Sequence, residues 1–375
     1  MSSPKILVLS PWSVLPPHFG SSERTYNLAQ GLAAHYRVTL LHTDYDQIKI
    51  SRTQTDIPGV KSYKVCPSRR WAQLFNPFLI LKGLQLIRQD RPALLISAHL
   101  WSGLHTLILH YLTGVPYILD EHNVEYVRWN RMQRKGISVL TWAERLSCQK
   151  AAAVFCVSEA DKKLLMKLGI PAEKIHVIRN AVDLTQYRPD PAGGVAARRE
   201  LGLSDQTPLV LFFGKLDYQP NSEAVDLIVH EIAPRVLAQN PGVRFVICGY
   251  RPPAEQYAGS PVTFTGMVPR IEDYINAAQA VIVPLISGGG TKFKIVQAIA
   301  CGRPVITTPI GAEGLDDAAA WMQVTDDWDE FARLIGQACT HPAAVSGPGW
   351  EAFCAGYRVE EMVTRARQVI ERCRA

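Results

Sequence analysis

The chain has 375 residues and a formal net charge of +6, with 47% hydrophobic and 20% charged residues. Because one hydrophobic core stops growing at about 250 to 300 residues, we expect two domains. The apolar content excludes a largely disordered protein. The modest charge, scattered along the chain, argues against a dedicated nucleic-acid-binding protein.

The cysteines and the N-terminus bear on the cellular compartment. Eight cysteines show no Cys-x-x-Cys pair and no His–Cys ligand spacing, so we predict reduced, buried thiols. The first residues, MSSPKILVLSPW, lack the pattern of a signal peptide, and no run of about 18 apolar residues could span a bilayer. We expect a cytoplasmic protein, with association to the inner face of the membrane left open.

Short apolar, β-branched runs alternate with helical patterns along the chain. In the first half, strands are predicted at residues 5–10, 37–42, 61–65, 93–98, 116–122, 152–158 and 174–180. In the second half, they are predicted at residues 208–214, 243–249, 262–266, 280–286 and 303–308. Strands that are apolar on both faces and separated by helices form covered parallel sheets. The fold class is therefore α/β, with two Rossmann-like doubly wound domains.

A segment between the two strand series is typical of a linker. Residues 187–208 are rich in proline, glycine and charge, and no strand pattern follows before Leu209. We therefore predict a first domain at residues 1–200 and a second at 201–355. The amphipathic C-terminal segment, 356–375, could pack back on the first domain.

Ligands of open parallel sheets bind at the carboxyl ends of the strands, so the loops there are candidate sites. The first such loop, SPWSVLPPHFG, ends at Gly20, and Ser21 or Ser22 could cap the helix that carries Arg24. The free N–H groups of a helix N-terminus attract phosphate. A capped surface helix would explain the same residues.

A second loop follows the strand at 208–214. Gly214 and Lys215 leave the strand end in the sequence FFGKLDYQPN. A lysine at this position can reach a phosphate as a point charge. The alternative is a solvated loop lysine.

The third loop is the most specific. It carries three consecutive glycines, Gly288, Gly289 and Gly290. Glycines let backbone amides approach a ligand, and Thr291 could cap the next helix. Lys292 and Lys294 then lie at a helix N-terminus, where the dipole disfavours a cation unless an anion offsets it. The pattern predicts a diphosphate site, with a glycine-rich turn between packed elements as the alternative.

The remaining acidic motifs are weaker. Glu313, in TTPIGAEGL, could accept hydrogen bonds from sugar or ribose hydroxyls, or belong to a capped turn. Asp44 with Asp46, and Asp327 with Asp329, could chelate a divalent cation, although such pairs are common by chance. Neither G-x-G-x-x-G after the first strand nor the P-loop motif occurs, which argues against a nicotinamide oxidoreductase and a P-loop NTPase.

Several motifs occur together in one order along nearly the whole chain. They are LDEHNVEY, VSEAD, VIRNAVD, GKLDYQPN, GGGTKFKIVQAIACGRPVITT and GAEGL. In this respect the chain resembles the family-4 glycosyltransferases of GT-B fold, and more narrowly a bacterial branch with GGGT-x-x-K. The resemblance implies two Rossmann-like domains facing each other across a cleft. It implies that the second domain binds a nucleoside diphosphate sugar and that the first presents an acceptor.

The resemblance also implies roles for individual residues in the second domain. Lys215 and Lys294 would contact the donor diphosphate, and the amides around Gly289 and Gly290 would cradle it. Many members carry two glutamates where this chain has Gly289 and Gln297. Gln297 can still bond ribose hydroxyls, but without the strength of a charged group.

In the first domain, Gly20 and Arg24 resemble the loop that closes over the donor. His99, in LLISAHLWSG, resembles a histidine beside the donor sugar, and His122 with Asn123 at the next strand end could face the acceptor. A lone histidine can also be purely structural. Ala181 replaces the glycine that is usual after Asn180.

The expected activity is sugar transfer with retention at the anomeric carbon, without a metal or other cofactor, in bacterial surface polysaccharide or glycoconjugate synthesis. The acceptor is expected to be a glycan, a lipid-linked or a protein-linked hydroxyl. The segment 69–92 could meet a membrane surface or pack in the first domain. The alternatives are a sugar-nucleotide epimerase, a non-catalytic partner of another transferase, and a metal-dependent transferase.

Overall fold

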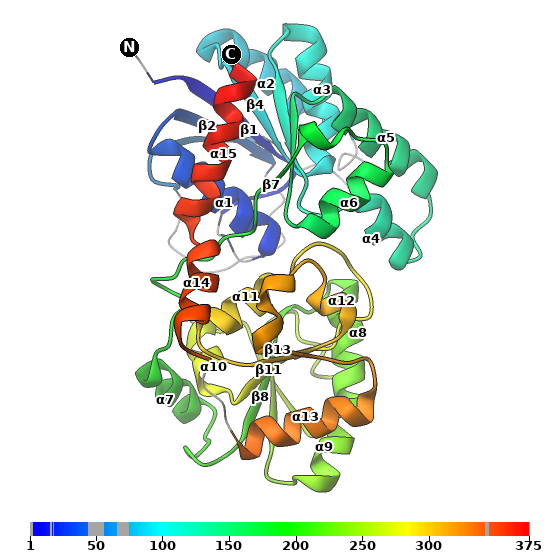
Figure 1. The fold of residues 1–375 in the computed structure, drawn as a ribbon, viewed down its shortest axis with the longest axis vertical. Coiled ribbons are helices and arrows are strands. Elements are labelled where there is room, and N and C mark those ends of the chain that lie inside the picture. Colours follow the sequence, from blue (N-terminus) through cyan, green and yellow to red (C-terminus); the bar gives the residue numbers. More distant parts are fainter. Residues whose placement is uncertain are drawn as a thin grey trace. The chain divides into compact units, whose positions relative to one another are not determined.

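The computed structural model describes residues 3–15, 17, 19–43, 56–65, 75–341 and 345–374. These residues form two compact units, each built on its own parallel sheet (Figure 1). The first unit comprises Met1–Ala181 and Val359–Ala375, and the second comprises Val182–Arg358. No helix within the described ranges is long and apolar enough to cross a bilayer.

The first unit contains a seven-stranded sheet in the order β3-β2-β1-β4-β5-β6-β7. Its strands are β1 (Lys5–Ser10), β2 (Arg37–Thr43), β3 (Val60–Val65), β4 (Leu94–Ala98), β5 (Tyr117–Asp120), β6 (Ala153–Cys156) and β7 (Ile175–Val177). All neighbouring pairs are parallel. Each strand lies within, or within one residue of, a predicted run.

Helices connect these strands. They are α1 (Gly20–Ala33), α2 (Pro77–Asp90), α3 (Leu100–Thr113), α4 (Glu125–Arg131), α5 (Ile137–Lys150), α6 (Glu159–Lys167), a short 3₁₀ helix (Ala172–Lys174) and α15 (Val359–Arg374). In Figure 1, the red α15 lies beside the blue α1, with which it is in contact.

The apolar strands bury side chains on both faces of this sheet. Ile6 and Val8 of β1 belong to the core formed with α1 and α15. The alternate residues, Leu7 and Leu9, belong to the core formed with α2, α3 and α5. This burial explains why the strands are continuously apolar instead of alternating with polar residues.

The second unit has a six-stranded sheet in the order β10-β9-β8-β11-β12-β13. Its strands are β8 (Leu209–Lys215), β9 (Arg244–Tyr250), β10 (Val262–Gly266), β11 (Ala280–Val283), β12 (Val305–Thr307) and β13 (Met322–Val324). All pairs are again parallel. The prediction missed only β13, which has three residues, two of them exposed.

The helices of the second unit are α7 (Pro191–Glu200), α8 (Gln219–Leu227), a π-helical turn (Ile228–Ile232), α9 (Ala233–Gln239), α10 (Ile271–Ala277), α11 (Phe293–Ala300), α12 (Pro309–Ala312), a 3₁₀ helix (Asp316–Trp321), α13 (Trp328–Thr340) and α14 (Pro348–Gly356). They surround one continuous apolar core.

The division between the units falls at Ala181–Val182, and not near residue 200 as predicted. The predicted linker contains α7, whose N-cap Asp190 accepts a hydrogen bond from the Gly193 N–H. This helix packs against α10 so closely that a Cβ on Gly194 would lie 2.8 Å from the Asn276 carbonyl oxygen. The glycines that suggested a linker therefore allow close helix packing.

The seven described cysteines are free; five of them are buried, as predicted, and Cys339 and Cys373 are partly exposed. Cys66 lies outside the described residues, as do Asp44 and Asp46.

The strand order of each sheet reverses once. The reversal lies between β1 and β4 in the first unit and between β8 and β11 in the second. Ligands of doubly wound sheets bind at the carboxyl ends of the strands at this switch point. The loops after these four strands carry the first and second candidate loops, His99 and the triple glycine.

Candidate functional site

In the second unit, Lys294 is held at the carboxyl end of β8. Its Nζ donates a hydrogen bond of 2.8 Å to Asn221 Oδ1 and lies 4.1 Å from the centroid of the Phe212 ring. Asn221 Nδ2 in turn donates to the Lys215 carbonyl oxygen at 2.8 Å. Asn221, which the sequence analysis quoted but did not assign, thus fixes Lys294 against the strand end.

Gly214 makes this approach possible. A Cβ at this position would lie 2.9 Å from Asn221 Nδ2 and 3.1 Å from Lys294 Nζ. Any side chain here would displace the amide or the ammonium group. The glycine predicted as a donor contact is therefore required for packing around Lys294.

The environment of Lys294 changes its acidity. Burial, and next the positive charge of Lys292, lowers the pKa of Lys294 to about 7. A negative charge close to Lys294 would raise this pKa and restore the ammonium form.

The triple glycine follows β11, and two of its members have positive φ, 106° at Gly288 and 63° at Gly290. Lys292, and not Thr291, is the N-cap of α11, because the chain remains extended until that residue. The buried Lys292 Nζ donates to the Gly290 carbonyl oxygen at 2.6 Å. The lysine therefore closes the glycine loop on itself.

Three other predicted residues lie in the same unit. Lys215 is 39% exposed, with its Nζ 3.7 Å from Asp217 Oδ1. Gln297 is buried on α11, and Glu313 is a partly exposed residue directly after α12. Since α11 and α12 both contact β12, these residues belong to neighbouring elements.

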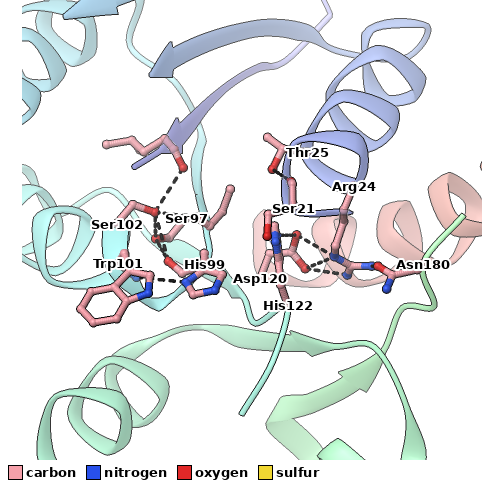
Figure 2. A network of polar contacts seen from close by, with 12 residues as sticks. Ser21, Arg24, Thr25, Ser97, His99, Trp101, Ser102, Asp120, His122 and Asn180 are labelled. Atoms are coloured by element: carbon pink, nitrogen blue, oxygen red, sulfur yellow. Dashed lines mark hydrogen bonds and ion pairs between the residues drawn. The ribbon is translucent and has the colours of Figure 1, made fainter. Parts of the chain in front are cut away.

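In the first unit, Arg24 is occupied by the protein itself (Figure 2). Its Nε and Nη2 donate to the Asp120 carboxylate, with a shortest distance of 2.6 Å, and Nη1 donates to Asn180 Oδ1 and the Arg179 carbonyl oxygen. Arg24 is 1% exposed. This geometry gives Arg24 a structural role and does not support the predicted contact with a donor phosphate.

At the start of α1, the prediction of a capping serine is confirmed for Ser22 and not for Ser21. The helix begins at Gly20, and the Ser22 hydroxyl, rather than Ser21, closes the first turn by accepting from the Phe19 N–H at 3.1 Å. Ser21 uses its carbonyl oxygen to accept from the Thr25 hydroxyl.

Asp120 joins Arg24 to His122. His122 Nε2 lies 3.1 Å from Asp120 Oδ2. Although burial raises the pKa of Asp120, the charge of Arg24 and the hydrogen bonds from His122 and Arg24 lower it well below its usual range. Burial lowers the pKa of His122 to about 4, so this side chain is neutral at pH 7. Asn123, the next predicted residue, is partly buried.

His99 lies at the end of β4 and is the N-cap of α3 (Figure 2). It has φ of 77°, which is strained for a residue with a side chain, and it is 2% exposed. The ring meets Trp12 and His122 edge to face, at centroid distances of 4.8 and 5.3 Å. His99 and His122 are therefore adjacent, as their consecutive strand ends suggested.

The sequence analysis missed a group of buried carboxylates beside His99. Glu125 Oε1 lies 3.2 Å from His99 Nε2, and Arg128 donates to both oxygens of Glu125. Glu144 accepts hydrogen bonds from the backbone N–H groups of Glu125 and Tyr126. The only signal in the sequence was the acidic character of LDEHNVEY, since the Glu144 contact spans 19 residues.

The second acidic pair has structural partners. Asp327 caps α13 by accepting from the N–H groups of Asp329 and Glu330, and Asp329 pairs with Arg235. Within the described parts of the chain, no group of three or more His, Cys, Asp or Glu side chains is placed to hold a metal ion.

Two family models match this chain. Residues 20–186 match Glycosyltransferase Family 4, and residues 207–341 match Glycosyl transferases group 1. The chain belongs to the family-4 glycosyltransferases. The predicted family is thus confirmed, whereas the narrower GGGT branch remains a prediction.

Curated members of the family are distant relatives of this chain. Alpha-maltose-1-phosphate synthase of Mycolicibacterium smegmatis is 27% identical over 62% of this chain and 64% of that protein. The synthase of Mycobacterium tuberculosis H37Rv is 30% identical over 34% of each chain. The chain thus spans between a third and two thirds of the length of these relatives. D-inositol 3-phosphate glycosyltransferase of Thermobispora bispora is 25% identical over 74% of this chain and 72% of its own.

Solved structures share the fold of this chain along its length. Sucrose-phosphate synthase from Thermosynechococcus elongatus has a TM-score of 0.81 at 18% identity, covering 98% of both chains. HepE from Anabaena, in complex with UDP and glucose, has a TM-score of 0.76 at 19% identity, covering 98% of this chain and 99% of its own. These likenesses confirm the predicted GT-B fold.

Proposed function

We propose that the protein transfers a sugar from a nucleoside diphosphate sugar to a hydroxyl group, with retention at the anomeric carbon. The observation that carries the proposal is the placement of Lys294 at the switch point of the second sheet. Asn221 holds this lysine there, and its own surroundings disfavour its charge. HepE was solved with UDP and glucose, which makes a UDP sugar the first donor to test.

The second unit would stabilise the leaving diphosphate. Negative charge grows on the phosphate as the glycosidic bond breaks, and fixed positive groups lower the energy of that state. Lys294 and Lys215, with the amides of the Gly288–Gly290 loop, are the groups near the two strand ends. No metal is required in this scheme, because the ammonium groups supply the charge.

The first unit would bind the acceptor and the sugar. The acceptor hydroxyl attacks the anomeric carbon from the face on which the diphosphate leaves, and its proton passes to a phosphate oxygen. His99 is the first-unit residue proposed to contact the sugar. We assign the product to surface polysaccharide or glycoconjugate synthesis in the cytoplasm, on the resemblance described above.

The proposal is tested by screening nucleotides and sugar nucleotides for a shift in Tm, followed by product analysis with the best donor. Transfer to a hydroxyl with an α-configured product from an α-configured donor supports retention. Release of an epimerised free sugar would instead identify an epimerase. Absence of nucleotide binding would favour a non-catalytic partner, and loss of activity in a chelator would contradict the metal-free scheme.

Binding of a diphosphate should be accompanied by proton uptake. At pH 8, a Lys294 with a pKa of about 7 is mostly neutral in the free protein. A bound diphosphate raises that pKa, so the complex takes up as much as about one proton. The phosphate itself is already ionised, since its last pKa is about 6.

This uptake is measured by titration calorimetry with UDP at pH 8, in buffers of different ionisation enthalpy. Because the protons come from the buffer, the observed binding enthalpy should become more positive as the ionisation enthalpy of the buffer increases. The dependence should disappear in Lys294→Ala titrated at high UDP. A wild-type enthalpy that is independent of the buffer would contradict the assignment.

We also propose that the first unit contacts a lipid surface that carries the acceptor. Phe75, just before α2, and Phe78 and Leu81, in its first two turns, are 54%, 58% and 63% exposed. Val139 and Trp142 on α5 are 71% and 62% exposed. Both helices pack against α3, so these side chains lie on one helical layer. Exposed aromatic and aliphatic residues of this kind bind at membrane interfaces. Trp71 lies outside the described residues.

The lipid contact is tested by sedimentation with vesicles of phosphatidylglycerol and phosphatidylcholine. The double variant Phe78→Ser, Leu81→Ser should reduce the bound fraction about tenfold or more, because each apolar side chain contributes about 1.5–3 kcal/mol when buried. Met267→Ser, at an exposed apolar residue of the second unit, is the matched control. Wild-type protein that stays in the supernatant would refute the contact.

A further inference from the structure

The ring of His99 has defined partners at both nitrogens. Its Nδ1 accepts a hydrogen bond from the Trp101 backbone N–H at 3.4 Å. Its Nε2 lies 3.2 Å from Glu125 Oε1. The backbone N–H of His99 donates to the Asp120 carbonyl oxygen at 2.8 Å, which ties the strand end to β5.

These partners determine which nitrogen carries the proton. A backbone N–H can only donate, so Nδ1 must hold the lone pair. A carboxylate can only accept, so Nε2 must carry the hydrogen. Both contacts agree on the same neutral tautomer.

Glu125 is built to remain a carboxylate although it is fully buried. Burial raises the pKa of Glu125, but the charge of Arg128 and the hydrogen bonds from His99 and Arg128 lower it to about 2. Arg128 Nε and Nη2 donate to its two oxygens at 2.9 and 2.5 Å. A buried charge of this kind is retained only when it is paired and hydrogen-bonded.

The helix that carries Glu125 is itself anchored. The N-terminus of α4 receives no cap from its own N-cap residue, Val124. Glu144 of α5 replaces that cap, at 2.6 Å from the N–H of Glu125 and 2.9 Å from that of Tyr126. The position of the Glu125 carboxylate relative to His99 is therefore set by two elements.

We propose that Glu125 is a positioning residue that holds the His99 ring as the Nε2–H tautomer and leaves Nδ1 as its hydrogen-bond acceptor. The consequence for the reaction rests on the proposed function. A sugar hydroxyl that contacts this ring must donate to Nδ1, in place of the Trp101 N–H. That contact, at 3.4 Å, is the longer of the two to the ring, so it is the easier one to exchange. The ring accepts from the sugar, while Glu125 keeps its orientation.

The tautomer is measured by NMR on protein labelled with ¹⁵N-histidine, and His99 is assigned by its absence in His99→Gln. The wild-type protein should show the Nε2–H pattern. Glu125→Ala should give a mixture of tautomers and lower kcat about tenfold or more, because part of the protein then holds the histidine in the wrong tautomer. Glu125→Gln keeps a side-chain oxygen for Nε2–H and should retain the wild-type tautomer.

Glu144→Gln is the matched control, because glutamine keeps an oxygen that accepts from the Glu125 N–H. It removes a buried carboxylate beside α4 while the Glu125 carboxylate stays in place. It should keep the wild-type tautomer of His99. An Nδ1–H pattern in the wild-type protein would overturn the proposal, and that measurement needs no variant to fold. So would a tautomer that is unchanged in Glu125→Ala, or one that shifts equally in Glu144→Gln. Absence of sugar transfer with every donor would reject the proposed function and leave the tautomer result standing.

Discussion

Replacing Lys294 with alanine is expected to weaken UDP binding by about 100-fold or more while leaving the fold intact. Truncating one member of a desolvated charge pair typically costs about 2–5 kcal/mol. Lys294 contacts Asn221 and the Phe212 ring but no carboxylate, so the free protein does not depend on its charge. The Tm of the variant should therefore be no lower than that of the wild-type protein, because a poorly solvated ammonium group is costly.

Affinity is measured by titration calorimetry and stability by thermal unfolding. Lys167→Ala, at an exposed lysine on α6, is the matched control and should bind UDP like the wild-type protein. Unchanged UDP affinity in Lys294→Ala would remove the main support for a diphosphate site at β8 and β11.

Replacing Arg24 with methionine is expected to lower the free energy of unfolding by about 3–5 kcal/mol, the cost of leaving a buried charge without its partner. The remaining Asp120 has no exposed surface, and its other side-chain contact is His122. The double variant Arg24→Met, Asp120→Asn should recover part of this loss, because no unpaired charge remains. Urea unfolding followed by circular dichroism measures both.

The same pair predicts a pH dependence. The pKa of Asp120 is lowered in the folded state, so its stabilisation is complete above the unfolded value of about 4 and is lost as the pH falls below it. The lowered pKa of His122 reduces the stability at higher pH than Asp120 does. As the pH falls from about 6.5 to 4, the unfolded histidine takes up a proton and the folded one does not. Wild-type stability should fall through both windows. In Arg24→Met, the loss of stability below about pH 4 should be absent. A free energy of unfolding that falls below pH 4 as steeply as in the wild-type protein would contradict the pairing.

The fold was predictable because its signal is local and repeated. Twelve apolar runs predicted twelve parallel strands, and among the strands that the structure describes only the three-residue β13 was missed. The boundary was not predictable from composition, because glycine marks linkers and close helix contacts alike. Gly194 belongs to the second kind, as its contact with Asn276 shows.

The candidate site was predictable only where its residues lie together on one loop. Lys294 and the glycines lie on one short segment, and the helix dipole makes a lysine there unusual. The partners of Arg24 and Lys294 lie 96 and 73 residues away, as Asp120 and Asn221. No spacing rule connects residues so far apart. The sequence analysis therefore assigned Arg24 to a ligand, whereas in the structure its guanidinium group is hydrogen-bonded to Asp120.

The return of the chain to the first unit has a consequence for biosynthesis. The Val182 N–H donates to the Tyr357 carbonyl oxygen at 2.9 Å, so the second unit begins and ends at neighbouring points. Its core contains no residue of α15. The first unit is synthesised earlier, but it cannot complete its core before α15 is made, since Met362, Val363 and Ala366 of α15 belong to that core. Until the ribosome has released these residues, part of the apolar surface on one face of the first unit's sheet is exposed to solvent, where chaperones can bind it.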